Sequence, residues 1–219
     1  MPTSVRFFFD YVSPYAYLAS TQLPALASRR GVEVEHVPVL FAAMLDASGA
    51  RGPGEVPMRR DYMFHDIVRL ARLFGVPLEP PATHPFNPLV ALRVTHGVED
   101  ARERRALVDA LFRAVWVESL AIDRPEVVAN VARGIGLDGD ALVDRASRPD
   151  AKARLRAATD EAIAARVFGV PTMIASGELF WGVDSLHLLE RFLDGADATD
   201  PSVIERWRRV APSASRRAI

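Results

Sequence analysis

FFFDYVSPYAYLA, residues 7–19, is the strongest structural signal in this sequence. Its start overlaps the run VRFFFD at 5–10, which is aromatic and β-branched with a charge at each end, as is typical of a buried strand. Pro14 suits the first turn of a helix, where its missing N–H costs nothing, and Ser13 directly before it is a natural N-cap. We therefore expect a strand that leads straight into a helix, with a hydroxyl group at the junction.

The pattern after this junction is first strand-like and then helical. The first helix is expected to run to about Arg30, and the alternating run VEVEHVPVL at 32–40 predicts a second strand. A Gly- and Pro-rich segment at 46–57 predicts a mobile loop. Helical patterns then follow at roughly 58–75, 87–98, 101–118, 124–135, 138–146 and 150–167.

Strand patterns return near the end of the chain. PTMIAS (171–176) and ELFWG (178–182) predict a short hairpin, and a helix is expected to begin at Asp184. The order is β-α-β, then helices, then β-β-α, which predicts an α/β thioredoxin-like fold with a large all-helical insertion between its two halves. We expect a thioredoxin-like domain formed by residues 1–40 and 168–219, and a helical insertion domain at 41–167.

Composition excludes several classes of function. The chain has 219 residues, 49% of them hydrophobic, so it can bury a substantial core. Lys+Arg 27 against Asp+Glu 28 gives a net charge of -1, which favours neither nucleic acid nor an anionic membrane as a partner. The apolar run near the start is too short for a signal peptide or a membrane span, so we expect a cytoplasmic protein.

Cysteine is absent, which removes disulfides, thiolate metal ligands and any cysteine nucleophile. No pair among the five histidines has metal-binding spacing on a helix, and we expect no metal.

Two stretches together carry a family resemblance. FFFDYVSPYAYLA and VFGVPTMIASGELFWGVDSLHLLERFL (167–193) resemble the 2-hydroxychromene-2-carboxylate isomerases and the related kappa-class glutathione transferases of the thioredoxin superfamily. The likeness covers essentially the whole chain, because RDYMFHDIVRLARLFGVPL and FRAVWVESLAI in the helical part also fit. It implies a homodimer that uses glutathione as cofactor and acts on a small aromatic substrate.

Ser13 is the residue on which this chemistry depends. Redox members of the superfamily carry Cys-x-x-Cys at this helix N-terminus, where this chain has Ser13-Pro14-Tyr15-Ala16, so disulfide exchange is excluded. A hydroxyl at that point can hydrogen-bond a glutathione thiolate, an interaction of about 1.5–3 kcal/mol or about one to two units of thiol pKa. The alternative is that Ser13 only caps its helix, which contributes about 1 kcal/mol.

Val170-Pro171 and Asp184 form the rest of the implied glutathione site. The resemblance implies a cis bond at Pro171 and main-chain pairing of Val170 with the cysteinyl part of glutathione; a trans proline that opens a strand is the alternative. Asp184 is placed to cap the helix that follows and, by resemblance, to bind the γ-glutamyl ammonium. Relatives usually have a polar residue before this Asp and Arg after it, where this chain has Val183 and Ser185, so weaker glutathione binding, or a different thiol or acceptor, stays an alternative.

Other candidates have a role by resemblance and a commoner structural alternative. Arg59, Arg60 and Asn87 lie near family positions that hold the glycyl carboxylate or line the substrate cleft, whereas arginines on a helix surface are commonly only solvated. Tyr15, Phe41 and Trp116 are candidates for an apolar wall, or for core packing. Asp10 is a candidate tuner of the site, or an ordinary strand-end charge. The implied glutathione contacts are Val170, Pro171, Asp184, Ser185, Arg59 and Asn87.

The resemblance implies a glutathione-dependent isomerase that converts 2-hydroxychromene-2-carboxylate to trans-o-hydroxybenzylidenepyruvate in the catabolism of naphthalene-type aromatics. Two alternatives stay open at this point. One is a kappa-like transferase that conjugates glutathione to an electrophile. The other is a non-catalytic thiol-binding protein that keeps the fold.

Overall fold

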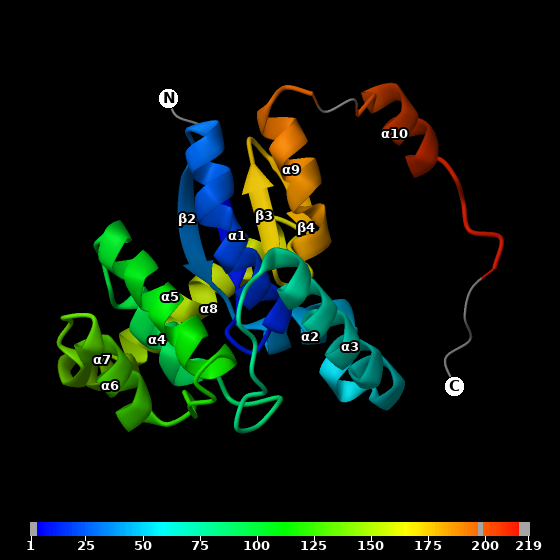
Figure 1. The fold of residues 1–219 in the computed structure, drawn as a ribbon. Coiled ribbons are helices and arrows are strands. Elements are labelled where there is room, and N and C mark those ends of the chain that lie inside the picture. Colours follow the sequence, from blue (N-terminus) through cyan, green and yellow to red (C-terminus); the bar gives the residue numbers. More distant parts are fainter. Residues whose placement is uncertain (1–3, 197–198, 215–219) are drawn as a thin grey trace.

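Four strands form one mixed sheet in the order β2-β1-β3-β4 (Figure 1). The structure is a computed structural model, and it describes residues 4–196 and 199–214. β1 pairs in parallel with β2 and antiparallel with β3, and β3 and β4 form the expected hairpin. The two halves of the chain therefore meet in one sheet, as the sequence predicts. The strands are β1 (Ser4–Phe9), β2 (Glu33–Pro38), β3 (Thr172–Ala175) and β4 (Glu178–Trp181).

The apolar run of β1 explains why this strand is central. Phe7, Phe8 and Phe9 are all 0% exposed, because neighbouring strands cover both edges of β1 and helices cover both faces. Side chains alternate across a strand, so Phe7 and Phe9 stack on one face, with ring centroids 5.3 Å apart, while Phe8 belongs to a second core on the other face.

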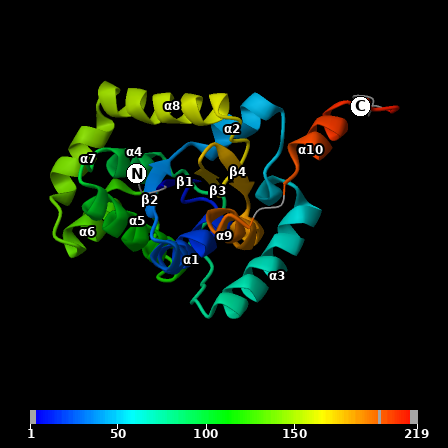
Figure 2. The same cartoon turned by 90° about the horizontal axis from the view of Figure 1, so that it is seen from above.

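Helices cover the two faces of the sheet in pairs (Figure 2). One face carries α1 (Pro14–Arg30) and α9 (Leu186–Leu193), and the other carries α2 (Phe41–Ser48) and α8 (Pro149–Ala164). The remaining helices are α3 (Pro57–Phe74), α4 (Leu89–His96), α5 (Ala101–Trp116), α6 (Pro125–Gly134), α7 (Gly139–Ser147) and α10 (Pro201–Arg208).

The larger core continues from the sheet into the helical segment. Phe9 of β1 packs against Phe112 of α5, with ring centroids 5.5 Å apart, and the same cluster includes Val128 of α6 and Leu142 of α7. The sheet and the inserted helices therefore share one continuous core. The predicted division into domains stays a prediction, and residues 1–3, 197–198 and 215–219 of the predicted thioredoxin-like domain lie outside the described residues.

The structure differs from the sequence prediction at the segment 46–57 and at the C-terminal end of the described chain. The segment 46–57 is less loop-like than expected, because α2 continues to Ser48 and a 3-10 helix forms at Pro53–Glu55. α10 was not predicted; it stands away from the body and has no buried residue (Figure 1). Among the described residues, no helix combines the length and apolar character needed to cross a membrane.

Candidate functional site

A tight turn joins β1 to α1. The Ser13 amide donates to the Asp10 carbonyl at 3.1 Å, which closes a β-turn. The Asp10 carboxylate accepts from the Val12 amide at 3.1 Å, and its second oxygen accepts from the Phe41 amide at 2.9 Å, at the start of α2. Asp10 therefore ties the turn together and fastens it to a second element.

Side chains from the inserted segment hold the carbonyls of the same turn. The indole Nε1 of Trp116, at the end of α5, donates to the Tyr11 carbonyl at 3.0 Å. His84, between α3 and α4, places Nε2 at 3.0 Å from the Val12 carbonyl, and because a carbonyl oxygen only accepts, this nitrogen carries the proton. The Tyr11 hydroxyl lies 2.7 Å from Thr95 Oγ1 of α4. The turn before Ser13 is thus fixed by α2, α4, α5 and the segment that carries His84.

Ser13 is the N-cap of α1, as predicted. Its hydroxyl oxygen accepts from the Ala16 amide at 3.2 Å, and its O–H points to the Val170 carbonyl at 3.5 Å, a long distance for a hydrogen bond. Pro14 has no N–H, and within residues 4–196 and 199–214 the Tyr15 amide meets no acceptor. Two donors, the Ser13 hydroxyl and the Tyr15 amide, therefore lie at the positive end of α1, which suits an anion.

Val170 and Pro171 lie beside Ser13, and the peptide bond between them is cis, which confirms the prediction. The Pro171 carbonyl accepts from the Gly182 amide at 2.9 Å, so the segment is anchored to the end of β4. In the described part of the chain the Val170 N–H has no acceptor. This main chain can therefore offer a donor to an extended ligand that lies next to Ser13.

Asp184 lies in a 3-10 turn, Val183–Ser185, between β4 and α9. Its side chain is exposed, and its negative charge contributes to raising the pKa of Tyr15 on α1, behind the larger effects of burial and of Asp66. The predicted cap role is wrong: the N-cap of α9 is Ser185 and has no side-chain cap bond, because the 3-10 turn keeps Asp184 one residue short of that position. Asp184 is free for other interactions at this end of α1.

The Ser185 hydroxyl is occupied within its own turn. It is buried and donates to the Gly182 carbonyl at 2.8 Å.

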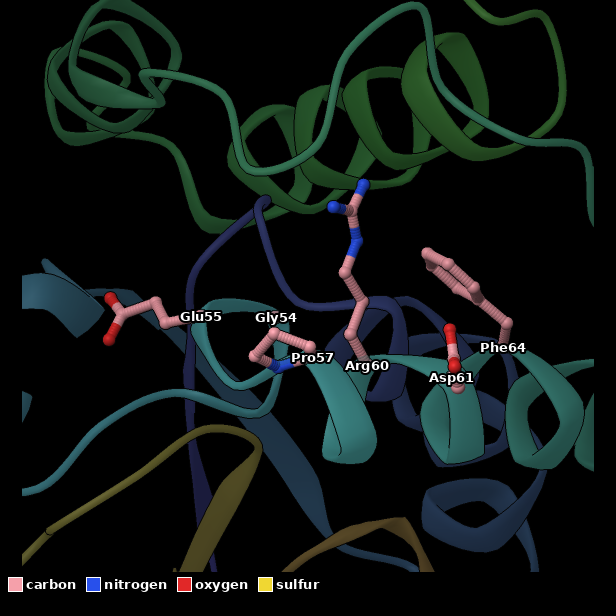
Figure 3. Close-up of a pocket in the computed structure, with 6 residues that line it drawn as sticks. All are labelled: Gly54, Glu55, Pro57, Arg60, Asp61 and Phe64. Atoms are coloured by element: carbon pink, nitrogen blue, oxygen red, sulfur yellow. The ribbon is translucent and has the colours of Figure 1, made fainter.

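Three polar residues of the implied cleft have different surroundings. Arg59 is exposed near the start of α3, and Asn87 is exposed and accepts from the Leu89 amide at 3.1 Å, next to the start of α4. Arg60 donates to the His84 carbonyl at 3.4 Å and lies over the Phe64 ring at 5.3 Å. Arg60 also lines a hollow of about 290 Å³ (Figure 3). The hollow is lined by Gly54, Glu55, Pro57, Arg60, Asp61 and Phe64.

Of the three aromatic candidates for an apolar wall or for core packing, Trp116 belongs to the core. It is 2% exposed and hydrogen-bonded to the turn. Tyr15 and Phe41 are only partly buried. The Tyr15 hydroxyl donates to Asp66 of α3 at 2.9 Å, and burial together with this bond raises the pKa of Tyr15.

His84 is a site residue that the sequence analysis did not single out, because the Pro-rich stretch PATHPFNP (81–88) is typical of a turn. Burial lowers the pKa of His84, so its imidazole is neutral at neutral pH. Its Nδ1 is buried without a partner among the described residues. Because Val12 lies 72 residues earlier in the sequence, no local pattern near His84 could reveal the contact.

Asp10 is the second electrostatic feature of the site. It is 1% exposed, and this burial raises the pKa of Asp10 to about 7 against the opposing effect of its two backbone hydrogen bonds. Among the described residues, no group of three or more His, Asp or Glu side chains is placed to hold a metal ion.

Comparison with known proteins gives consistent matches over most of the chain. A family model of the DsbA-like thioredoxin domain matches residues 4–194. The chain is 35% identical over 188 residues to a 2-hydroxychromene-2-carboxylate isomerase of Pseudomonas putida, covering 85% of this chain and 92% of that protein. It is 23% identical over 232 residues to glutathione S-transferase kappa 1 of Homo sapiens, covering 98% and 96%.

A solved structure of selenomethionine 2-hydroxychromene-2-carboxylate isomerase has a TM-score of 0.80 and 31% identity, and the match covers 94% of this chain and 96% of that one. These matches confirm the thioredoxin-like fold that the sequence predicts.

Trp116→Phe tests whether the turn depends on its contacts with the insertion. The change leaves the Tyr11 carbonyl buried without its donor, so we expect the free energy of unfolding to fall by about 1–3 kcal/mol or more in urea titrations. Trp207→Phe on α10, where the side chain is 70% exposed, is the control and should change it by less than about 0.5 kcal/mol. Equal losses in both variants would contradict the role assigned to Trp116.

Proposed function

The chain belongs to the family of the 2-hydroxychromene-2-carboxylate isomerases, and we propose that it converts 2-hydroxychromene-2-carboxylate to trans-o-hydroxybenzylidenepyruvate with glutathione as catalytic cofactor. The chain is an enzyme, because its relatives are isomerases and, more distantly, glutathione transferases. It has no cysteine, so it lacks the dithiol needed for disulfide exchange.

The observation that carries this proposal is the pair of donors at the N-terminus of α1. The Ser13 O–H is held only loosely by the Val170 carbonyl at 3.5 Å, so it can turn to an incoming sulfur while the Ala16 amide keeps its bond to the hydroxyl oxygen. The Tyr15 amide adds a second donor. Both favour the thiolate over the thiol, and the relationship to a glutathione S-transferase supports glutathione as the thiol.

The bound thiolate provides the chemistry of isomerisation. The cyclic hemiketal first opens: its ring C–O bond breaks and the hemiketal hydroxyl proton passes to the phenol oxygen, which gives a keto group conjugated to the carbon–carbon double bond. The sulfur then adds to the end of that double bond next to the aromatic ring, and the electron pair of the double bond moves toward the keto group. The former double bond is now single, so rotation about it is fast. Return of the electron pair re-forms the double bond in the trans arrangement and expels the thiolate, so glutathione is regenerated.

The rest of glutathione is proposed to bind along the neighbouring main chain and side chains. Val170 with Pro171 would pair with the cysteinyl unit, Asp184 would hold the γ-glutamyl ammonium, and Arg59 and Asn87 are candidates for the glycyl carboxylate. Val183 is 3% exposed and Ser185 is bonded within its own turn, so Asp184 has no helper from these two positions. The homodimer and the cytoplasmic location stay predictions.

Ser13→Ala tests the central residue. Loss of one charge-assisted hydrogen bond should lower the rate of isomerisation by about 10- to 100-fold. It should also raise the pKa of bound glutathione by about one to two units, followed through the ultraviolet absorbance of the thiolate. Ser20→Ala is the matched control, because its buried hydroxyl bonds only the Tyr17 carbonyl in the same helix, and it should leave the rate unchanged.

Product analysis distinguishes the isomerase from the transferase. If glutathione is recovered in full after many turnovers, it acts as a cofactor; if it is consumed in step with the substrate, the protein is a conjugating transferase. Ser13→Ala turning over substrate as fast as the parent would contradict the role of the hydroxyl in either reaction.

Asp184→Asn tests the γ-glutamyl contact. Because this side chain is exposed, the ion pair is worth little, and we expect the Kd for glutathione to rise by about 2- to 5-fold in calorimetry. The dipeptide Cys-Gly lacks the γ-glutamyl group, so its Kd should be the same for both proteins. An equal loss for the two ligands would show that Asp184 acts on something other than this group.

A further inference from the structure

Asp10 is the only buried acidic residue in the described part of the chain. Its carboxylate is 1% exposed and takes part in no ion pair there; only the Val12 and Phe41 amides donate to it. A buried carboxylate without a cation is costly, and two backbone donors offset only part of that cost. Positioning Ser13 requires acceptors but no titratable group, so the acid at this position calls for a further explanation.

The buried and half-buried titratable side chains that form hydrogen bonds at this turn or beside it are neutral near pH 7. Tyr11 bonds Thr95, His84 bonds the Val12 carbonyl, and His96 of α4 bonds the Pro38 carbonyl at the end of β2, beside the turn. Burial lowers the pKa of His84 and His96, and burial raises the pKa of Tyr11. α2 and α8 contribute the Phe41 amide and the Thr159 hydroxyl, which binds the Leu40 amide. An ionised Asp10 would thus be the one buried formal charge among these groups, because the charges that act on His84 and Tyr11 from outside belong to the exposed side chains of Arg60 and Asp109.

Asp10 is also close to where the sulfur would sit. The β-turn that joins its carbonyl to the Ser13 amide keeps the Cα atoms of the two residues within about 7 Å. The turn allows a separation of about 7–10 Å between the carboxylate and the sulfur, and at an effective dielectric constant of about 20 two negative charges at that distance change each other's pKa by about one to two units. The negative charge on the thiolate and the negative charge on the Asp10 carboxylate therefore destabilise each other.

We propose that Asp10 is a positioning residue that is coupled to the cofactor by a proton: when glutathione ionises at Ser13, a proton is held on the Asp10 carboxyl. This inference rests on the proposed function, because it needs a thiolate at Ser13. The sulfur loses one proton and the carboxylate gains one, so the site keeps its net charge. Burial already raises the pKa of Asp10 to about 7, so the carboxyl can take up this proton at neutral pH.

The direct test is the pKa of Asp10 in the unmodified protein, measured from the pH titration of its side-chain carboxyl carbon by NMR. The resonance is assigned by transfer from the Asp10 backbone and by its absence in Asp10→Asn. We expect this pKa to rise by about one to two units when glutathione is bound. S-methylglutathione is the matched ligand, because its sulfur cannot ionise, and it should leave the pKa unchanged.

The second measurement is the pKa of bound glutathione in Asp10→Asn. Because the thiol and Asp10 titrate as a coupled pair in the parent, removal of the carboxyl should lower the thiol pKa by up to about one unit and replace a two-step titration by a single step. This shift is opposite in direction to that expected for Ser13→Ala. Asp46→Asn, at an exposed acid of α2, should cause no shift. A merely structural role of Asp10 would weaken binding without this shift in pKa.

The outcomes separate the two proposals. If calorimetry shows that glutathione binds but the Asp10 pKa is the same with glutathione and S-methylglutathione, the coupling is overturned and the proposed function stands. If glutathione does not bind at all, both fail.

Discussion

The turn from Asp10 to Ser13 is the constraint on which the site depends. Its main chain leaves β1 and must place a hydroxyl at the N-terminus of α1, yet it is too buried for water to satisfy its polar groups. Asp10, Trp116 and His84 supply the missing partners. An unpaired buried group costs about 1–3 kcal/mol, so the orientation of Ser13 is set by contacts from distant parts of the chain.

This constraint gives the inserted helices a role in the chemistry. Trp116 and His84 both belong to the segment between the two halves of the sheet, and both bind carbonyls of residues just before Ser13. Arg60 adds a further bond to the His84 carbonyl and lines the hollow beside it. The helical segment therefore completes the thioredoxin-like site. Under the proposed function the reactive sulfur has to arrive with the ligand, because the chain has no cysteine, and the fold supplies only the donors that stabilise the thiolate.

The sequence predicts well what local chemistry determines. β1 was evident because its aromatic run has charges only at its ends, and the cap at Ser13 was evident because Pro14 follows it. Contacts between distant residues were not evident: His84 looked like part of a turn, and for Trp116 the sequence left a substrate wall and core packing as alternatives, of which the structure shows the core. The cap role of Asp184 was wrong because a 3-10 turn, which has no clear sequence signal, precedes α9. α10 was missed for a related reason, since it buries nothing and its apolar pattern is short.

The continuous core between the sheet and the inserted helices has a consequence for dissecting the protein. Phe9 and Phe112 belong to different parts of the chain but to one cluster, so neither part can open without exposing apolar surface of the other. The protein should melt in a single cooperative transition, and a protease that cuts within the helices should abolish the sheet as well. Deleting the inserted helices would remove apolar side chains against which the sheet packs, so the remaining thioredoxin-like part should not fold alone.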